Sequence, residues 1–179
     1  MIYNSGNYVS NTGTIGRVTQ QQGAPAQAIP VPGAGAAPPA GEARYDVALS
    51  YAGEQERLVS RVAKILEAEG LRVFFAPYRD DAFIGEDMYA RFYQIYRYQS
   101  RYVAAFVTAD YLRKEITMHE AATAMLRRRD EGRSCLIPIY FGGASLPNLD
   151  PDINYIPADS LREVEIADKI RGVVRSLDR

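Results

Sequence analysis

The sequence predicts an α/β domain of three layers, in which helices cover both faces of a parallel β-sheet. Two observations favour this class. From residue 44 onward, short apolar runs alternate with longer segments whose apolar residues recur at helical spacing. The short runs are apolar along their whole length, which is typical of parallel strands that are buried on both sides.

The first predicted elements are a strand, a helix and a second strand. Tyr45–Ser50 (YDVALS) is the first strand and Leu71–Ala76 (LRVFFA) the second. Gly70 stands where the C-terminus of a helix favours a left-handed residue. The helix between the strands, Glu54–Glu69, has an apolar stripe at Leu58, Val62, Ile65 and Leu66.

The middle of the chain repeats this order. After a loop at Pro77–Gly85, a helix is predicted over Glu86–Gln99, with Met88, Phe92, Ile95 and Gln99 in line along it. Tyr102–Thr108 (YVAAFVT) is the third strand. Asp110–Arg129 is predicted to be one long helix, with its apolar stripe at Met118, Ala121, Ala122 and Met125.

Two strands and a helix complete the domain. Cys135–Phe141 is the fourth strand and Ile153–Ile156 a short fifth. Ser160 and Glu163 form a capping-box pattern before the last helix, Leu161–Leu177. Five strands in such a chain predict a flavodoxin-like sandwich with strand order 2-1-3-4-5, whose ligands bind at the carboxyl ends of the strands.

Residues 1–43 differ in composition and are predicted to form a flexible, disordered tail. Only Arg17 and Glu42 are charged there, and residues 20–43, a predicted linker, consist mostly of Gln, Ala, Gly and Pro. Residues 2–17 are rich in Asn and Gly and almost uncharged, as a cross-β stack requires. They resemble short bacterial amyloid-signalling motifs, which implies assembly with a sensor protein; a disordered leader is the alternative.

Composition restricts the classes of partner. The net charge of -1 and the sequence pI of about 5.9 argue against nucleic acid or an anionic membrane as a partner bound through bulk charge. One His and one Cys disfavour a zinc site, so no metal is expected. Cys135 cannot form an internal disulfide, and neither a signal-like leader nor a run of roughly 20 apolar residues is present. We expect a cytoplasmic protein.

Periodicity alone places Glu120 on the surface of the third helix, opposite the stripe through Met118 and Met125. His119 points about 100° away from Glu120 and is expected to be a bystander. Residues 127–129, three arginines, are expected to be a solvated helix end. Four tyrosines on one helix are too many for a single buried stripe, so some are expected at the surface, as in a self-assembly face: Tyr89, Tyr93, Tyr96 and Tyr98.

Four segments in order resemble the bacterial TIR domains, over residues 44 to 175. They are Tyr45–Glu54 (YDVALSYAGE), Phe83–Tyr89 (FIGEDMY), Tyr111–Glu120 (YLRKEITMHE) and Ile137–Ile156. The resemblance implies a TIR domain over residues 44–179 that acts by homotypic assembly. It further implies an NAD+ nucleosidase, which cleaves the nicotinamide–ribose bond to give nicotinamide and ADP-ribose or a cyclic variant, as an assembly-activated effector of bacterial anti-phage immunity.

The resemblance also implies the site. Glu120 falls on the catalytic glutamate, and the loop Pro77–Gly85 on a segment that gates the pocket and mediates assembly. NAD+ is the substrate, with no separate cofactor. The chain has no tryptophan, and isoleucines stand at 84 and 116, where the family often has one; Ala76 stands where many members have an aspartate. The residues expected to line the NAD+ pocket are Ser50, Tyr51, Phe83, Ile84, Tyr111 and Ile116.

Two other functions stay open at this stage. The missing tryptophans favour a non-catalytic TIR module that acts only by homotypic assembly. A relative of the deoxyribosyltransferases, with a covalent glutamate, would have a similar fold. A response-regulator receiver is disfavoured, because no acidic pair follows the first strand and no aspartate ends the third.

Overall fold

The computed structural model describes residues 43–76, 87–132 and 134–176, without the side chains of residues 128–131. The expected tail, with its assembly segment and its linker, therefore lies outside the described residues, except for its last residue. The expected loop Pro77–Gly85 also lies outside them.

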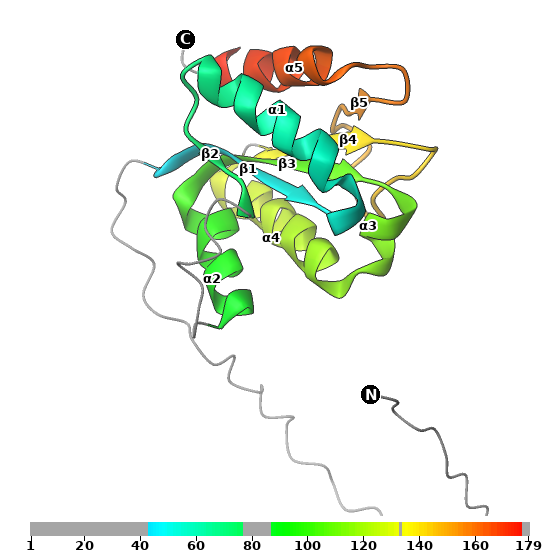
Figure 1. The fold of residues 1–179 in the computed structure, drawn as a ribbon. Coiled ribbons are helices and arrows are strands. Elements are labelled where there is room, and N and C mark those ends of the chain that lie inside the picture. Colours follow the sequence, from blue (N-terminus) through cyan, green and yellow to red (C-terminus); the bar gives the residue numbers. More distant parts are fainter. Residues whose placement is uncertain (1–42, 77–86, 133, 177–179) are drawn as a thin grey trace, which may run out of the picture. The chain divides into compact units, whose positions relative to one another are not determined.

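A five-stranded sheet forms the centre of the domain (Figure 1). All four pairings between neighbouring strands are parallel, in the order β2-β1-β3-β4-β5, which confirms the predicted 2-1-3-4-5 topology. The strands are β1 (Tyr45–Tyr51), β2 (Val73–Phe74), β3 (Ser100–Val107), β4 (Leu136–Tyr140) and β5 (Ile156–Pro157).

Helices cover both faces of the sheet, as predicted. Helices α1 (Glu56–Ala68) and α5 (Glu163–Ser176) lie together on one face (Figure 1). The opposite face carries α2 (Met88–Gln94), α3 (Ala109–Arg113) and α4 (Glu115–Glu131). A 3-10 turn, η1 (Gly53–Gln55), precedes α1, and a π-helical turn, η3 (Ile95–Gln99), joins α2 to β3.

Alternation along the strands divides the buried side chains into two cores. Val47 and Leu49 of β1 point toward α1 and α5, whereas Ala48 points toward α4. On the α4 side, alanines occur on the strands and on the helix alike. They allow α4 to approach the sheet closely: Ala48, Ala105, Ala121 and Ala124.

The single long helix predicted over Asp110–Arg129 is two helices. Lys114 has an extended backbone, with φ -97° and ψ 124°, and separates α3 from α4. Of the predicted apolar stripe of α4, Met118, Ala121 and Met125 do face the core, but Ala122 is exposed. Glu120, expected on the surface, is buried. The reason is that this helix buries polar side chains beside its alanines, so the division of polar from apolar residues no longer marks the inward face.

Arg127 provides the second correction, because it is buried rather than solvated. Its side chain is 5% exposed and donates from Nη1 to the carbonyl oxygens of Tyr96, at 3.3 Å, and Ser100, at 2.6 Å. Arg127 thus joins the C-terminal part of α4 to η3 and to the start of β3. Arg128 and Arg129 belong to the side chains that are not described.

Smaller differences concern the ends of elements. The last helix begins at Glu163, and its N-terminus is closed by Glu165, which accepts from the backbone N–H of Arg162 at 2.9 Å. Only the acidic half of a capping box is present there, two residues later than the predicted pair of Ser160 and Glu163. Within the described residues, no helix combines the length and the apolar character needed to cross a membrane.

Replacement of Arg127 by Met keeps most of the side-chain volume but leaves two carbonyl oxygens of the η3–β3 junction without this donor. We expect a loss of about 1.5–3 kcal/mol in the free energy of unfolding, since the bonds to a buried guanidinium disappear. Urea unfolding measures the loss. Arg175→Met is the matched control, because exposed Arg175 also donates to a carbonyl oxygen, that of Glu69 at 2.9 Å, and should change stability by less than about 0.5 kcal/mol. Equal losses would contradict a special role for Arg127.

Candidate active site

The site lies at the carboxyl edge of the sheet, where β1 and β3 end. Ser50 is the last residue but one of β1 and pairs in register with Ala105 of β3. Thr108 follows β3 and accepts a hydrogen bond from the backbone N–H of Tyr111 at 3.1 Å, which caps the N-terminus of α3. This cap directs Tyr111 back toward the end of β1.

Three side chains meet at this edge in a continuous hydrogen-bonded chain. The hydroxyl oxygens of Tyr111 and Ser50 are 2.7 Å apart. The Ser50 hydroxyl donates to Oε2 of Glu120 at 2.6 Å. Ser50 and Tyr111 are fully buried, and Glu120 is 5% exposed. The carboxyl group of Glu120 therefore lies inside the protein, not on its surface.

The start of α4 determines why Glu120 points inward. Thr117 donates its hydroxyl proton toward the carbonyl oxygens of Tyr111 and Lys114, at 2.5 and 2.9 Å, and so fixes the bend between α3 and α4. From Thr117, the helical period brings Glu120 and Ala121 toward the sheet. The contact between Lys114 Nζ and Glu54 Oε2, at 2.6 Å, ties the same bend to the turn after β1.

A fourth side chain, Tyr96 of η3, reaches Glu120 from another direction. Tyr96 is 2% exposed, and its hydroxyl donates to the carbonyl oxygen of Leu49 in β1 at 3.1 Å. The same hydroxyl lowers the pKa of the Glu120 carboxyl. The site thus combines one carboxyl with three hydroxyl groups.

Burial dominates the electrostatics of this cluster. Loss of water raises the pKa of Glu120 from 4.5 to about 8, although Ser50 and Tyr96 act in the opposite direction. Burial and the nearby Glu120 charge also raise the pKa of both phenols, Tyr96 and Tyr111. A carboxyl group of this kind is mostly neutral at pH 7. A positive charge that comes close stabilises its ionised form, the carboxylate.

The structure brings together three of the residues expected from the sequence: Ser50, Tyr111 and Glu120. Tyr51 points elsewhere, because successive residues of a strand face opposite sides; its ring stacks on Phe75, at 5.4 Å between centroids, in the core beneath α1. Ile116, one turn before Glu120, is 36% exposed. Phe83 and Ile84 lie outside the described residues.

His119, next to Glu120 in the sequence, points away from it as expected. His119 is exposed, and its ring lies against Tyr89 and Tyr93 of α2, at 6.1 and 6.3 Å between centroids. Within the described part of the chain, no hydrogen bond joins the side chains of His119 and Glu120. Of the four clustered tyrosines, Tyr96 is buried and Tyr89 is 46% exposed.

Tyr96 is the site residue that the sequence analysis did not single out. The available signal was its spacing of four residues from Phe92, which places both on the inward side of the helix. That spacing predicts burial of Tyr96. It contains no information that the hydroxyl meets a glutamate from a distant segment.

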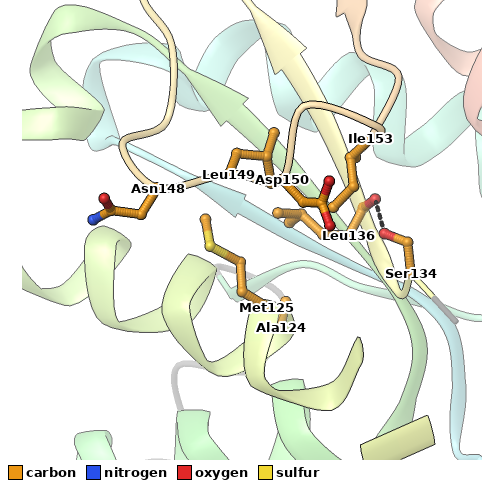
Figure 2. A pocket seen from close by; sticks show the side chains of 8 residues that line it. All are labelled: Ala124, Met125, Ser134, Leu136, Asn148, Leu149, Asp150 and Ile153. Atoms are coloured by element: carbon orange, nitrogen blue, oxygen red, sulfur yellow. Dashed lines mark hydrogen bonds between the residues drawn. The ribbon is translucent and has the colours of Figure 1, made fainter. Parts of the chain in front are cut away.

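A pocket of about 430 Å³ lies elsewhere, between α4 and the segment that joins β4 to β5 (Figure 2). Met125 points into it from α4, and none of the expected site residues lines it. The remaining lining residues are Ala124, Ser134, Leu136, Asn148, Leu149, Asp150 and Ile153.

Among the described residues, no group of three or more His, Cys, Asp or Glu side chains is close enough to hold a metal ion.

Comparison with known proteins assigns this fold to a family. A family model of the TIR domain matches residues 47–171. The chain is 33% identical over 123 residues to the 3' cyclic ADP-D-ribose synthase AaTIR of Aquimarina amphilecti. This match covers 69% of the chain but 38% of the relative, so the chain spans little more than a third of that protein's length.

Solved structures agree on the fold. The TIR domain of the Toll-related receptor TRR-2 from Hydra magnipapillata superposes with a TM-score of 0.56, over 75% of this chain and 99% of that one, at 18% identity. The likeness at this identity concerns the fold alone. Together with the family match over most of the described domain, it leads to one conclusion: the chain belongs to the TIR-domain family.

Proposed function

We propose that this chain cleaves the nicotinamide–ribose bond of NAD+, with the carboxylate of Glu120 as the catalytic group. The observation that carries the proposal is the buried Glu120 carboxyl at the carboxyl edge of the sheet, held by Ser50 at 2.6 Å. Ligands of doubly wound α/β folds bind at this edge. A buried carboxyl with a strongly raised pKa is also typical of a functional site.

The named relative supports the choice of substrate. A cyclic ADP-ribose synthase needs a donor of ADP-ribose that has a leaving group on the ribose. NAD+ is such a donor, since its nicotinamide is a cationic pyridinium that departs as a neutral molecule. The family match over residues 47–171 includes Ser50, Tyr111 and Glu120.

The chemistry requires little beyond a carboxylate. Because nicotinamide departs neutral, no general acid has to protonate it. Its departure leaves a ribose with oxocarbenium-like positive charge, as in glycoside hydrolysis. A carboxylate in a site of low polarity stabilises that charge electrostatically. Water then attacks to give ADP-ribose, or a group of the same molecule attacks to give a cyclic product.

The burial of Glu120 supports this role in a specific way. The carboxyl is mostly neutral in the empty site, because its pKa is raised to about 8. The positive charge of NAD+, and then of the ribose, favours the carboxylate where it is needed. Since Glu120 is only 5% exposed, substrate contact also requires side chains above it to move.

We assign different roles to the other expected residues. Fully buried Ser50 and Tyr111 act on Glu120 and do not form the wall of an open pocket. Ile116, at the surface one turn before Glu120, fits a contact with the substrate at the entrance. The proposed contacts of NAD+ with Tyr51, Phe83 and Ile84 rest on the family resemblance alone.

A TIR module that acts only by homotypic assembly is the second candidate function. Large apolar side chains on α2 and α4 favour it, since Met88, Tyr89 and Leu126 are each 46–50% exposed. Tyr89 lies against His119, so the two helices contribute to one surface. Activation by assembly and a role in bacterial anti-phage immunity stay predictions, as do a cytoplasmic location and a sensor partner bound through residues 2–17.

Replacement of Glu120 by Gln keeps the shape of the side chain and removes its charge. We expect nicotinamide release from NAD+ to fall by about 10²-fold or more, because the charge that stabilises the transition state is lost. Chromatography of NAD+ incubated with the full chain measures the release, under crowding and with assembly followed by light scattering. Exposed Glu115 on the same helix provides the control, and Glu115→Gln should retain activity. An assembled parent protein that releases no nicotinamide would favour the assembly module.

The rate of cleavage should also depend on pH in a defined direction. Catalysis requires the charged form of Glu120, whose pKa in the free protein is about 8. We therefore expect kcat/KM to increase about tenfold per pH unit below pH 8 and to level off above it. The profile of kcat should level off at lower pH, since bound NAD+ favours the carboxylate. A kcat/KM that is constant from pH 6 to pH 9 would exclude this ionisation.

A further inference from the structure

The hydroxyl group of Tyr111 lies at the end of a chain of hydrogen bonds that leads to Glu120. Its oxygen is 2.7 Å from the hydroxyl oxygen of Ser50, which is 2.6 Å from Oε2 of Glu120. Tyr111 of α3 and Ser50 of β1 are both 0% exposed. Within the described residues, the Tyr111 hydroxyl is thus linked to the carboxyl through Ser50.

The backbone of Tyr111 is fixed on both sides. Its N–H donates to the hydroxyl of Thr108, at 3.1 Å, and its carbonyl oxygen accepts from the hydroxyl of Thr117, at 2.5 Å. Thr117 lies on α4, three residues before Glu120. The contacts therefore form a closed ring, which runs through Ser50 and Tyr111 and returns along α4. In such a ring, the Tyr111 hydroxyl has little freedom to leave Ser50.

The protons of this chain have a defined direction. The Tyr111 hydroxyl has one proton, and Ser50 is its partner among the described residues. Since buried donors pair with acceptors, the Tyr111 proton lies on the Ser50 oxygen. Ser50 then directs its own proton to Glu120, as the donor in the 2.6 Å bond. The reverse order would leave the Tyr111 proton without an acceptor among these three side chains.

This direction affects the charge on Glu120. Burial raises the pKa of the carboxyl to about 8, and the bond from Ser50 acts against this rise, because a carboxylate accepts more strongly than a neutral carboxyl. Once the Tyr111 proton is removed, the Ser50 oxygen can instead accept the proton of neutral Glu120. The neutral form then gains a bond of its own. Tyr111 thus decides which form of the carboxyl Ser50 stabilises.

We propose that Tyr111 is a positioning residue for Glu120, which acts through Ser50 by holding the Ser50 proton toward the carboxyl. Its importance for catalysis rests on the proposed cleavage of NAD+, whereas the order of the hydrogen bonds does not. The family resemblance implied that Tyr111 lines the NAD+ pocket. In the structure it is fully buried, and its hydroxyl contacts Ser50.

The Tyr111 phenol stays a donor over the pH range of the tests. Burial, and then the nearby Glu120 charge, raise its pKa well above the usual value. Arg127 of α4 donates to backbone carbonyl oxygens, and Lys114 pairs with Glu54 at the surface, so neither cation belongs to the chain of hydroxyls. The other ionisable side chains around the chain come from β1, η1, η3, the α3–α4 bend and α4: Tyr51, Glu54, Tyr96, Lys114 and Arg127.

Tyr111→Phe removes the hydroxyl and keeps the ring. We expect the pH at which kcat/KM levels off to increase by about half a unit, because the neutral form of Glu120 gains a partner. At pH 7, kcat/KM should then fall about threefold, and above about pH 10 it should return to the parent value. The measurement is the pH profile of NAD+ cleavage by the full chain. A loss of activity that is the same at every pH would indicate a merely structural role and would overturn the proposal.

Ser50→Ala tests whether Tyr111 acts through Ser50. This change removes the donor itself, so we expect a larger shift, of about one pH unit. In a protein that carries Ser50→Ala, the further change Tyr111→Phe should leave the profile where it is, because the connection is already broken. An equal shift with and without the Ser50 hydroxyl would mean that Tyr111 acts by another route, and it would overturn the proposal.

Tyr102→Phe is the matched control. Tyr102 of β3 is 1% exposed, nearly as buried as Tyr111, but it belongs to the core beneath α1 and α5. Its replacement also removes one buried hydroxyl, and it should leave the pH profile in place. A shift in this control equal to that of Tyr111→Phe would also overturn the proposal.

A second measurement is independent of NAD+ cleavage. Between pH 4.5 and about 8, the folded state retains the Glu120 proton that the unfolded state has lost. The stability of the parent relative to Glu120→Gln therefore decreases with pH in this range and levels off above it. When both proteins carry Tyr111→Phe, the levelling should move up by about half a pH unit in urea unfolding.

The two measurements separate the two proposals. A shift in unfolding without any NAD+ cleavage would leave the role of Tyr111 intact and contradict the proposed function. Identical levelling with and without the Tyr111 hydroxyl would overturn the role of Tyr111, whatever the activity. If Tyr111→Phe does not fold, 3-fluorotyrosine at position 111 replaces it. As a stronger donor, it should move both profiles to lower pH, and an unchanged profile would overturn the proposal.

Discussion

Transfer of a carboxyl group from water into the interior of a protein is unfavourable unless hydrogen bonds replace the lost hydration. The Glu120 carboxyl is buried in this way, and the structure around it supplies the replacements. Ser50 of β1 donates to the carboxyl, Tyr111 of α3 supports Ser50, and Tyr96 of η3 lowers the pKa of Glu120. Each belongs to a different element, so the relative position of those elements determines whether Glu120 is tolerated at all.

Three features of the fold meet this requirement. Small side chains on both surfaces let α4 lie close to the sheet, and the bend at Lys114 sets its direction. Arg127 then attaches the far part of α4 to the η3–β3 junction. An acidic and a basic side chain, two turns apart, are thus buried on the same helix face. Arg127 binds the turn that contains Tyr96, and Glu120 binds Ser50 of β1.

The raised pKa of Glu120 connects this architecture to the proposed reaction. Burial keeps the group neutral in the empty site, and an approaching cation reverses that preference. The carboxylate of Glu120 stabilises a positively charged substrate and a positively charged transition state. In the empty site the group is uncharged, so its burial then costs little free energy. This property distinguishes Glu120 from a surface glutamate, which would be charged and hydrated at all times.

Local sequence determined the sheet order and the layers, because apolar runs and helical spacing depend on neighbours in the chain. The resemblance also marked Ser50, Tyr111 and Glu120, which the structure brings together. Periodicity misplaced Glu120 and Arg127, since it counts polar residues as exposed and cannot register partners from other segments. The burial of both and the position of Tyr96 were decided by tertiary packing, because the hydrogen bonds that offset their desolvation join residues 27 to 70 positions apart.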